Sequence, residues 1–583
     1  MKVSDARISA LFLGVVCVFA LLAARLVQIQ LLEHETFARG AVEQQYKQVE
    51  VEARRGRVYD RNLRLLATTV PCPSVFVNPT EAPNLRYLAG TLSDALGVDA
   101  GALYGTLSAK AGRQFMWVKR RISPSEYQAF LSLTPVQRSG AYVRWERKRT
   151  YPLGRHASHV LGFVDIDNQG RLGIESALQE ELAGRAGRET LATDGKGNLR
   201  VIYQACDEPA TPGLSAVLTI DSTIQEMVEE EIAKGFEERQ PEAVMALVMR
   251  TETGEILALA NLPAFDPNKP GADPPTHLMD RAVQTRYEPG SIFKPFILSA
   301  ALDKDAVSLS ERFFCYNGVY RTGKRILHDH HPYGWLTAAE IVIHSSNIGI
   351  TRIGEALGAS RQQECLAAFR IGARTGVELP GEISGQVTPA RKWSYYTSTS
   401  VPMGHEVAAT PIRLLAAFNA IANGGVLVEP RVVKAVVDDQ LRIVRTPEAA
   451  ATTRVISEGT AKRMMGEVLA EVVEQGTGKQ AKLDRWKLAG KTGTAQKILE
   501  DGTYSHSRYI ASFLCAAPAE RTVATILVMF DAPTKGASLY GGSVAAPVAS
   551  AIARRVLEYY DIPPSEDGST STFARASRTE AGR

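Results

Sequence analysis

The longest uninterrupted apolar stretch of the sequence lies close to its N-terminus. Residues 8–24 carry no charged side chain, and Leu26 and Val27 extend the apolar pattern beyond Arg25. A helix of about 20 apolar residues is long enough to cross the hydrocarbon core of a bilayer. Arg25 would lie at the far interface, where its long side chain reaches the headgroups. We therefore predict a transmembrane anchor over residues 8–28.

Basic residues indicate the orientation of this anchor. Lys2 and Arg7 precede it, and flanking positive charge favours the cytoplasmic side of a membrane. A cleaved signal peptide is the alternative, but Ala20–Ala24 offers no clean A-x-A cleavage site and the apolar pattern continues past it. We expect residues 1–7 in the cytoplasm and the chain beyond the anchor outside it.

Residues 29–208 show mixed helical and strand patterns. We expect a helical stalk over Gln28–Gln48 and then a β-type stretch with a turn over Arg54–Asn62. The segments Leu85–Leu96 and Ser123–Leu133 are amphipathic, and Glu175–Leu182 is an acidic helical segment. This pattern predicts an α/β stalk and pedestal domain with no obvious nucleophile.

A Pro/Gly-containing break over Pro209–Gly213 opens a second domain over residues 209–560. Asp221 is placed to cap a long helix over Ser222–Glu238. Five stretches have strand character and short turns join them in pairs, which suggests a five-stranded antiparallel sheet: Ala243–Met249, Glu255–Ala260, Trp486–Ala489, Tyr509–Ala516 and Val523–Phe530. Residues 265–480 are mainly helical, and Ala545–Tyr559 forms an amphipathic helix over one sheet face. We expect residues 561–583 to be a disordered tail. The fold class is α/β multidomain.

Composition excludes several classes of function. A length of 583 residues requires two or more domains, and hydrophobic and charged contents of 45% and 22% are those of a globular protein. The net charge of +4 gives no broad basic field, so we expect no nucleic-acid partner. The six cysteines are irregularly spaced and lack a metal-ligand pattern. Adjacent side chains in His328–His331 cannot converge easily on a metal, so we expect a loop there.

The first string that could carry catalytic chemistry is Ser291-Ile292-Phe293-Lys294, at the start of a predicted helix. Residues three apart share a helix face, so Ser291 and Lys294 point the same way. A neutral lysine amine can remove the serine proton, which requires a pKa lowered by desolvation and a nearby cation. We expect Lys491 to be that cation.

Two further strings complete a candidate site. In Ser345-Ser346-Asn347, the Ser345 hydroxyl can relay a proton to a leaving amine and the Asn347 amide can hold a peptide carbonyl. In Lys491-Thr492-Gly493-Thr494, the lysine and two threonine hydroxyls suit a terminal carboxylate, and Gly493 leaves room for a substrate backbone. The backbone amides of Ser291 and Thr494 can form an oxyanion hole. Taken singly, these strings are also typical of a helix turn, a polar loop and a strand.

The ordered set S-x-x-K, S-x-N, K-T-G resembles the penicillin-recognising serine enzymes, which include penicillin-binding proteins and serine β-lactamases. Further strings resemble class B penicillin-binding proteins: Tyr287–Lys294, Met403–Glu406, Thr410-Pro411, Asn423–Gly425, Tyr540–Ser543 and, in the pedestal, Arg55–Asn62. The likeness covers roughly residues 8–560. It departs at Leu63, where glycine is usual, and at His405, where an aromatic residue or glutamine is common.

The resemblance implies a bacterial peptidoglycan D,D-transpeptidase of the inner membrane, with its catalytic domain in the periplasm or extracytoplasmic space. Ser291 would attack the D-Ala-D-Ala end of a stem peptide and pass the acyl group to an amine of a neighbouring stem. β-Lactams would form a stable acyl-enzyme. The family's transpeptidase domain is the penicillin-binding, serine β-lactamase-like fold, and no metal or cofactor is implied. Glu406 is expected to be structural, because an amine and not water must finish the reaction.

Several alternatives stay open. The string Glu288-Pro289-Gly290 and the chain length favour the septal, cell-division type, expected beside a polytopic lipid II polymerase and other division proteins. An elongation-specific class B enzyme is the nearest alternative. A serine β-lactamase or β-lactam sensor is an alternative with the same fold, but it would normally lack the pedestal. A D,D-carboxypeptidase is a similar alternative. A bifunctional class A protein would need a glycosyltransferase module before the serine domain. A membrane-anchored, non-catalytic division scaffold is an alternative of a different kind.

Overall fold

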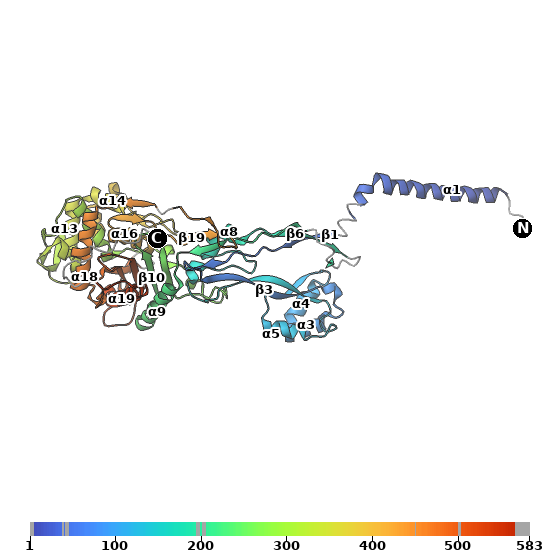
Figure 1. Ribbon diagram of the computed structural model, residues 1–583, viewed down its shortest axis with the longest axis horizontal. Coiled ribbons are helices and arrows are strands. Elements are labelled where there is room, and N and C mark those ends of the chain that lie inside the picture. The colour runs from blue at the N-terminus through green and yellow to red at the C-terminus, as the bar shows by residue number, and fades with distance from the viewer. Residues whose placement is uncertain are drawn as a thin grey trace, which may run out of the picture. The chain divides into compact units, whose positions relative to one another are not determined.

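The computed structural model describes residues 5–37, 40, 46–193, 199–200, 206–448, 451–498 and 503–565 (Figure 1). The chain divides into two compact units, Met1–Arg55 with Ala183–Gly213 and Gly56–Leu182 with Leu214–Arg583. The predicted disordered tail lies outside the described residues from residue 566 onward.

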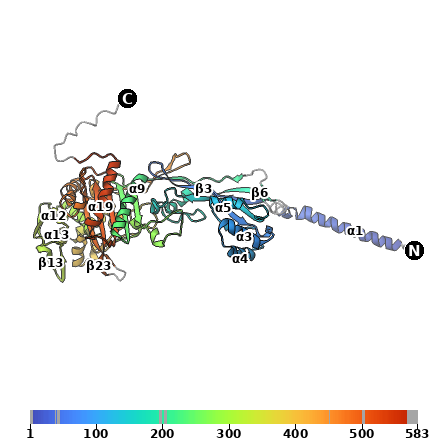
Figure 2. The ribbon, with the colours of Figure 1, turned by 90° about the horizontal axis from the view of Figure 1, so that it is seen from below.

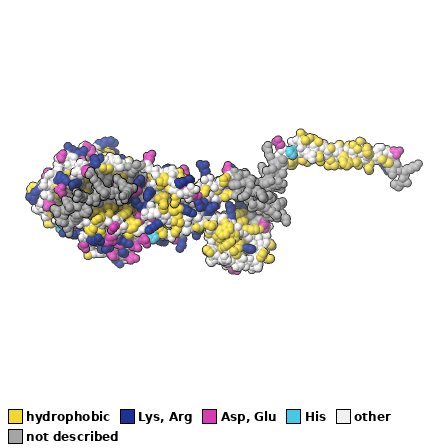
Figure 3. Space-filling view, viewed as in Figure 1, with side chains coloured by type: hydrophobic (Ala, Val, Ile, Leu, Met, Phe, Trp, Pro, Cys, Tyr) yellow, Lys and Arg dark blue, Asp and Glu magenta, His cyan; other side chains and the backbone are white. Residues whose placement is uncertain are grey.

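The first unit contains the apolar helix α1 (Asp5–Val27), which continues into a π-helical turn, η1 (Gln28–Leu32). Apolar side chains cover α1 along its length (Figure 3), and the helix is long and apolar enough to cross a membrane. The unit also contains a four-stranded sheet of β1 (Tyr46–Val51), β6 (Gly187–Thr193), β7 (Leu199–Arg200) and β8 (Cys206–Glu208). The predicted helical stalk is wrong at Tyr46–Gln48, because these residues pair with β6 in β1.

The second unit contains a seven-stranded sheet with the order β20-β19-β9-β2-β3-β4, and β5 also pairs with β3. Its strands are β2 (Val58–Tyr59), β3 (Leu65–Val77), β4 (Met116–Lys119), β5 (Ala141–Thr150), β9 (Ser215–Leu218), β19 (Val433–Val437) and β20 (Ile443–Arg445). The pair β2–β9 is parallel, whereas the others are antiparallel. Through this pair, residues 58–59 and 216–217 belong to one sheet.

Three helices pack against β3, β4 and β5: α3 (Leu85–Leu96), α4 (Ala100–Ala109) and α5 (Pro124–Leu131). Asn84, Asp99 and Ser123 cap their N-termini by accepting backbone N–H hydrogen bonds, as short polar side chains do at this position. The predicted helix Leu85–Leu96 is confirmed. The predicted helix Glu175–Leu182 is instead two short helices, α7 (Gly173–Ala177) and α8 (Gln179–Ala183).

A five-stranded antiparallel sheet forms the centre of the second unit, with the order β11-β10-β24-β23-β22, and confirms the prediction. The strands are β10 (Ala243–Arg250), β11 (Ile256–Leu262), β22 (Ala489–Ile498), β23 (Tyr504–Ala517) and β24 (Ala524–Asp531). Strand β22 begins only at Ala489. The residue Trp486, predicted to lie in this strand, instead packs in the apolar cluster with α19 and donates its indole N–H to Ile562 O at 3.1 Å.

Helices cover both faces of this sheet. Alternate β10 residues Val244, Ala246 and Val248 pack in one apolar cluster with α9 (Ser222–Arg239) and α19 (Gly541–Tyr559). The intervening Met245, Leu247 and Met249 pack in a second cluster with α11 (Lys294–Asp303), α12 (Ala338–Ile343), α13 (Asn347–Leu357) and α16 (Pro411–Ala422). Figure 2 shows α12 and α13 on the opposite side of the sheet from α9. Asp221 caps α9 as predicted.

The other α-helices and paired strands of this unit are short. The helices are α6 (Ser158–Leu161), α10 (Arg281–Gln284), α14 (Ala359–Ala368), α15 (Tyr395–Ser400), α17 (Glu458–Arg463) and α18 (Ala470–Glu474). The paired strands are β12 (Arg312–Phe314) with β15 (Trp335–Thr337), β13 (Val319–Thr322) with β14 (Arg325–His328), β16 (Gln386–Val387) with β17 (Val407–Ala408), and β18 (Val426–Val428) with β21 (Thr452–Arg454).

Candidate active site

Ser291 lies on a short 3-10 turn, η4 (Gly290–Phe293), that runs directly into α11. Gly290 has a φ of +54° and Gly404 a φ of +83°, and Gly290 N–H donates to Gly404 O at 3.1 Å. A Cβ atom on Gly404 would lie 2.2 Å from Gly290 O, so no other residue fits there without a shift of the backbone. Two glycines therefore fix the turn that presents the half-buried Ser291.

Lys294 is fully buried and faces the second string. Its Nζ atom lies 2.5 Å from Ser345 O, 2.8 Å from Asn347 Oδ1 and 3.1 Å from Ser345 Oγ. Within the described part of the chain, Ser291 Oγ makes no hydrogen bond. The structure thus brings Lys294 together with Ser345 and Asn347, and it leaves the serine hydroxyl free to meet a ligand.

Lys491 enters the same cluster from β22. Its side chain is fully buried, and its Nζ atom lies 3.0 Å from Ser345 Oγ and donates to Thr492 O at 3.1 Å. Ser345 therefore stands between two lysine nitrogens. It has a φ of +60°, a left-handed conformation that is costly for a non-glycine residue and that clusters at functional sites.

The electrostatics of the two lysines follow from their burial. Burial lowers the pKa of Lys294 to about 7, and the negative charge of Asp329 opposes this shift. Burial and the positive charge of Lys294 hold the pKa of Lys491 well below its usual value. The sequence predicted desolvation and the charge of Lys491 as the two causes at Lys294. Desolvation is the main cause, whereas the charge between the two lysines acts on Lys491.

Asp329 is a site residue that the sequence analysis missed. Its carboxylate accepts hydrogen bonds from Ser346 Oγ at 2.6 Å, Asn347 N at 2.5 Å and Ile348 N at 3.0 Å, so it caps the helix that begins in the second string. Asn347 Nδ2 also donates to His328 O at 3.1 Å. The only sequence signal for Asp329 was its place in the string His328–His331, which we expected to form a loop. In the structure, Asp329 holds Asn347 in place.

The third string lies on β22, one of the two edge strands of the five-stranded sheet. Thr492 Oγ1 lies 2.7 Å from Thr477 Oγ1, and Thr494 Oγ1 accepts from Gly541 N at 3.1 Å. A Cβ on Gly493 would meet Ser512 Oγ at 2.5 Å and Ile292 Cγ2 at 2.7 Å. The missing side chain therefore lets β22 pack closely against the turn that carries Ser291, a reason that the sequence did not indicate.

Glu288 ties the turn to the residues that follow Gly404. It accepts hydrogen bonds from His405 Nδ1, Glu406 N and Tyr504 Oη, each at 2.9 Å. Burial alone would raise the pKa of Glu288, but these hydrogen bonds and the charge of His405 hold it below its usual value. Glu288 is therefore an anionic anchor for the segment beside Ser291, and it holds this segment through the backbone N–H of Glu406.

Comparisons with known proteins agree with this geometry. The sequence matches the penicillin binding protein transpeptidase domain over residues 244–554 and the penicillin-binding protein dimerisation domain over residues 50–218. The chain belongs to the class B penicillin-binding proteins.

Among the described residues, no group of three or more His, Cys, Asp or Glu side chains is arranged to hold a metal ion.

Two relatives and one solved structure show how far the likeness to this family extends. The chain is 33% identical to stage V sporulation protein D of Bacillus subtilis, over 97% of this chain and 88% of the relative. It is 31% identical to the probable peptidoglycan D,D-transpeptidase PenA of Neisseria meningitidis, over 97% and 94%. Penicillin binding protein 3 of Mycobacterium tuberculosis, solved in complex with aztreonam, matches with a TM-score of 0.69 and 28% identity, over 89% and 98%.

Proposed function

We propose that this penicillin-binding protein is a peptidoglycan D,D-transpeptidase that forms an acyl-enzyme on Ser291. The observation that carries the proposal is the pair of buried lysines, Lys294 and Lys491, that face the single hydroxyl of Ser345 beside the turn of Ser291. Perturbed pKa values in such a cluster are typical of catalytic acids and bases. Membership of this class B family agrees with the assignment.

In the acylation step, Lys294 acts as the base. A neutral amine has two N–H donors and one lone pair, and Ser345 O and Asn347 Oδ1 accept the two donors. The lone pair is then left to take the proton of Ser291. Ser291 Oγ bonds to the carbonyl carbon of the penultimate D-Ala, and the backbone amides of Ser291 and Thr494 stabilise the oxyanion.

The terminal D-Ala leaves when the tetrahedral intermediate collapses and the peptide bond breaks. Its nitrogen takes a proton relayed through Ser345 Oγ, which lies within 3.1 Å of both lysine nitrogens. Lys491, Thr492 and Thr494 hold its carboxylate. An amine of a neighbouring stem then attacks the acyl carbon and the bond from this carbon to Ser291 Oγ breaks. Lys294 passes the proton of the amine to Ser291 Oγ, and an amide cross-link forms. A β-lactam follows the first half of this route and remains on Ser291.

The place of this reaction in the cell is part of the proposal. The apolar helix α1 anchors the chain in the inner membrane with residues 1–7 in the cytoplasm, and residues 29–208 and 209–560 act outside it as pedestal and transpeptidase domains. We assign the enzyme to septal synthesis beside a polytopic lipid II polymerase. A fluorescent fusion tests this assignment, since midcell rings are expected and patches along the sidewall would indicate elongation instead.

A fluorescent penicillin tests the chemistry. The full-length chain is expected to be labelled and the Ser291→Ala variant is not. Ser299→Ala is a matched control, because Ser299 is a buried serine on α11 whose hydroxyl donates to Phe296 O at 2.9 Å. Label that survives in Ser291→Ala, or no label on the native chain, would overturn the proposal. Slow release of the label separates a transpeptidase from a β-lactamase.

A further inference from the structure

A polar cavity of about 770 Å³ lies beside the segment that Glu288 anchors next to Ser291. Its lining includes Lys324, Arg325, Tyr396, Glu406, Gln496 and Tyr504. Gln496 is two residues beyond Thr494 on β22, and Tyr504 donates to the Glu288 carboxylate that anchors the segment beside Ser291. We call this cavity the basic groove. Gln496 places it beside the part of β22 that follows Thr494.

The direction of a bound stem peptide follows from the site. Its terminal carboxylate lies at Lys491 and Thr492, and its scissile carbonyl lies at Ser291 and Thr494. A peptide paired with β22 in this position runs antiparallel to the strand, so its preceding residues extend toward Gln496 at about 3.4 Å per residue. The residue before the acylated D-Ala therefore lies level with the basic groove.

The walls of the groove are charged. Lys324 and Arg325 come from the β13–β14 hairpin, and no ion pair to a carboxylate is formed by either side chain among the described residues. Glu406 lines the same cavity, and its carboxylate also makes no ion pair in the described part of the chain. His405 also lines the cavity, but its Nδ1 is engaged by Glu288. The groove thus presents two cations and one anion that have no ion-pair partner of their own among the described residues.

The hairpin that carries the two cations is fixed in place. Tyr396 Oη accepts from Lys324 N at 3.0 Å, and Arg325 Nη1 donates to Ser400 Oγ at 2.5 Å. The hydroxyls of Thr322 and Tyr395 lie 2.5 Å apart. Helix α15 therefore holds the turn against the groove, so ligand binding orders little further structure there.

We propose that the basic groove binds the side chain of the stem-peptide residue preceding the acylated D-Ala, and that it selects a side chain ending in both a carboxylate and an ammonium group. This inference rests on the proposed transpeptidase function. The carboxylate pairs with Arg325 and Lys324, and the ammonium pairs with Glu406. A side chain that ends in an ammonium alone meets two like charges and is disfavoured.

Synthetic stem pentapeptides test the inference with the full-length chain in detergent. The third residue is meso-diaminopimelate, lysine or 2-aminopimelate, which carries only the carboxylate, and the release of D-Ala is measured. The kcat/KM for the diaminopimelate peptide is expected to exceed that for the lysine peptide by about tenfold or more. The double substitution Lys324→Gln, Arg325→Gln is expected to reduce this ratio to below about threefold, mainly through KM.

The other variants separate the two charges of the ligand. Glu406→Gln is expected to remove the advantage of diaminopimelate over 2-aminopimelate while it keeps the advantage over lysine. Lys462→Gln on α17 is the control, since this exposed lysine lies outside the groove, and it should change no ratio. Equal kcat/KM values for all three peptides, or a ratio that survives the double substitution, would overturn the inference.

Penicillin labelling keeps the two proposals apart. Every variant is first checked for label on Ser291, which shows that it is folded and can be acylated. A native chain that takes the label but does not discriminate between the peptides contradicts only the assignment of the groove. A native chain that takes no label contradicts the transpeptidase function itself.

Discussion

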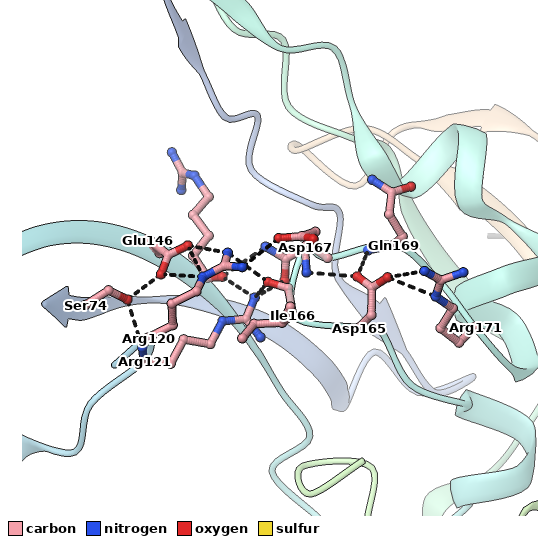
Figure 4. Close-up of polar contacts among 11 residues, drawn as sticks. Ser74, Arg120, Arg121, Glu146, Asp165, Ile166, Asp167, Gln169 and Arg171 are labelled. Atoms are coloured by element: carbon pink, nitrogen blue, oxygen red, sulfur yellow. Dashed lines mark hydrogen bonds and ion pairs between the residues drawn. The ribbon is translucent and has the colours of Figure 1, made fainter. Parts of the chain in front are cut away.

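Buried charge occurs in two regions of the second unit, and the two regions balance it differently. Around Ser345, the amines of Lys294 and Lys491 are fully buried and contact hydroxyl, carbonyl and amide groups, while Asp329 binds the neighbouring backbone. In the region of β3–β5, Arg149 pairs with Glu175 at 2.5 Å, and each side chain is 1% exposed. Arg120 likewise pairs with Glu146, as Figure 4 shows.

The difference separates chemistry from architecture. An arginine paired with carboxylates fixes the positions of strands and loops, as the half-buried Arg120 does when it joins Glu146 on β5 to Asp167 (Figure 4). Lys294 is buried without such a carboxylate, so its pKa falls to about 7 and it can give up its proton near neutral pH. The first arrangement contributes to structure, and the second provides a base.

The largest expected effect is on catalysis, through Lys294→Met. Methionine fills a similar volume without an amine, so the rate of acylation by a fluorescent penicillin should fall by about 10²–10⁴-fold. The melting temperature should change little, because the cost of burying the amine disappears together with its hydrogen bonds to Ser345 O and Asn347 Oδ1. A rate within tenfold of the native value would show that Lys294 is not the base.

The paired region should respond in stability instead. Arg149→Met removes the guanidinium that balances the buried charge of Glu175 and should reduce the free energy of unfolding by about 3–5 kcal/mol. The double variant Arg149→Met, Glu175→Leu should recover most of this loss, because no uncompensated charge remains. Urea denaturation measures both, and a single variant as stable as the native chain would contradict the distinction between the two regions.

Asp329→Asn should combine both kinds of effect at a smaller size. It weakens the cap on Asn347 and Ile348 and should cost about 1.5–3 kcal/mol of stability.

In the native chain, the acylation rate should rise with pH through about 7, as Lys294 loses its proton.

The same variant should shift this pH profile. The negative charge of Asp329 raises the pKa of Lys294, so its removal should move the midpoint to lower pH. Lys491, the second lysine at Ser345 Oγ, is unchanged in the variant. An unmoved or higher midpoint would show that Asp329 does not act on Lys294, and Lys294→Met should abolish the inflection.

The smallest effect is expected at an exposed ion pair. Arg463 Nε lies 3.3 Å from Glu467 Oε1, with side chains that are 47% and 57% exposed. Because water screens such a pair, Arg463→Ala should change the free energy of unfolding by less than about 0.5 kcal/mol. A loss of several kcal/mol would mean that burial is not what separates strong from weak pairs in this chain.

Much of this arrangement could be predicted from local sequence pattern. The five strands of the central sheet, the helix start at Asp221 and the three site strings were all apparent, because hydrophobic alternation, capping residues and short motifs act over a few neighbouring positions. The family resemblance came from the same strings. The strand at Tyr46–Gln48 was mistaken for a helix because its pairing partner lies more than 140 residues away.

What the sequence determined by itself is the set of reactive groups and their order along the chain: a serine at a helix start, a polar serine–asparagine string and a lysine on a strand. Only the tertiary structure decided which groups share a proton path. Three of its features depend on segments that are not neighbours in the sequence. They are the burial that lowers the pKa of Lys294, the cap that Asp329 provides, and the close approach of Gly493 to Ile292. Desolvation and close packing depend on the folded surroundings of a residue. The sequence therefore identifies Lys294 as the candidate base, but only its burial in the fold lowers its pKa enough for it to act as one.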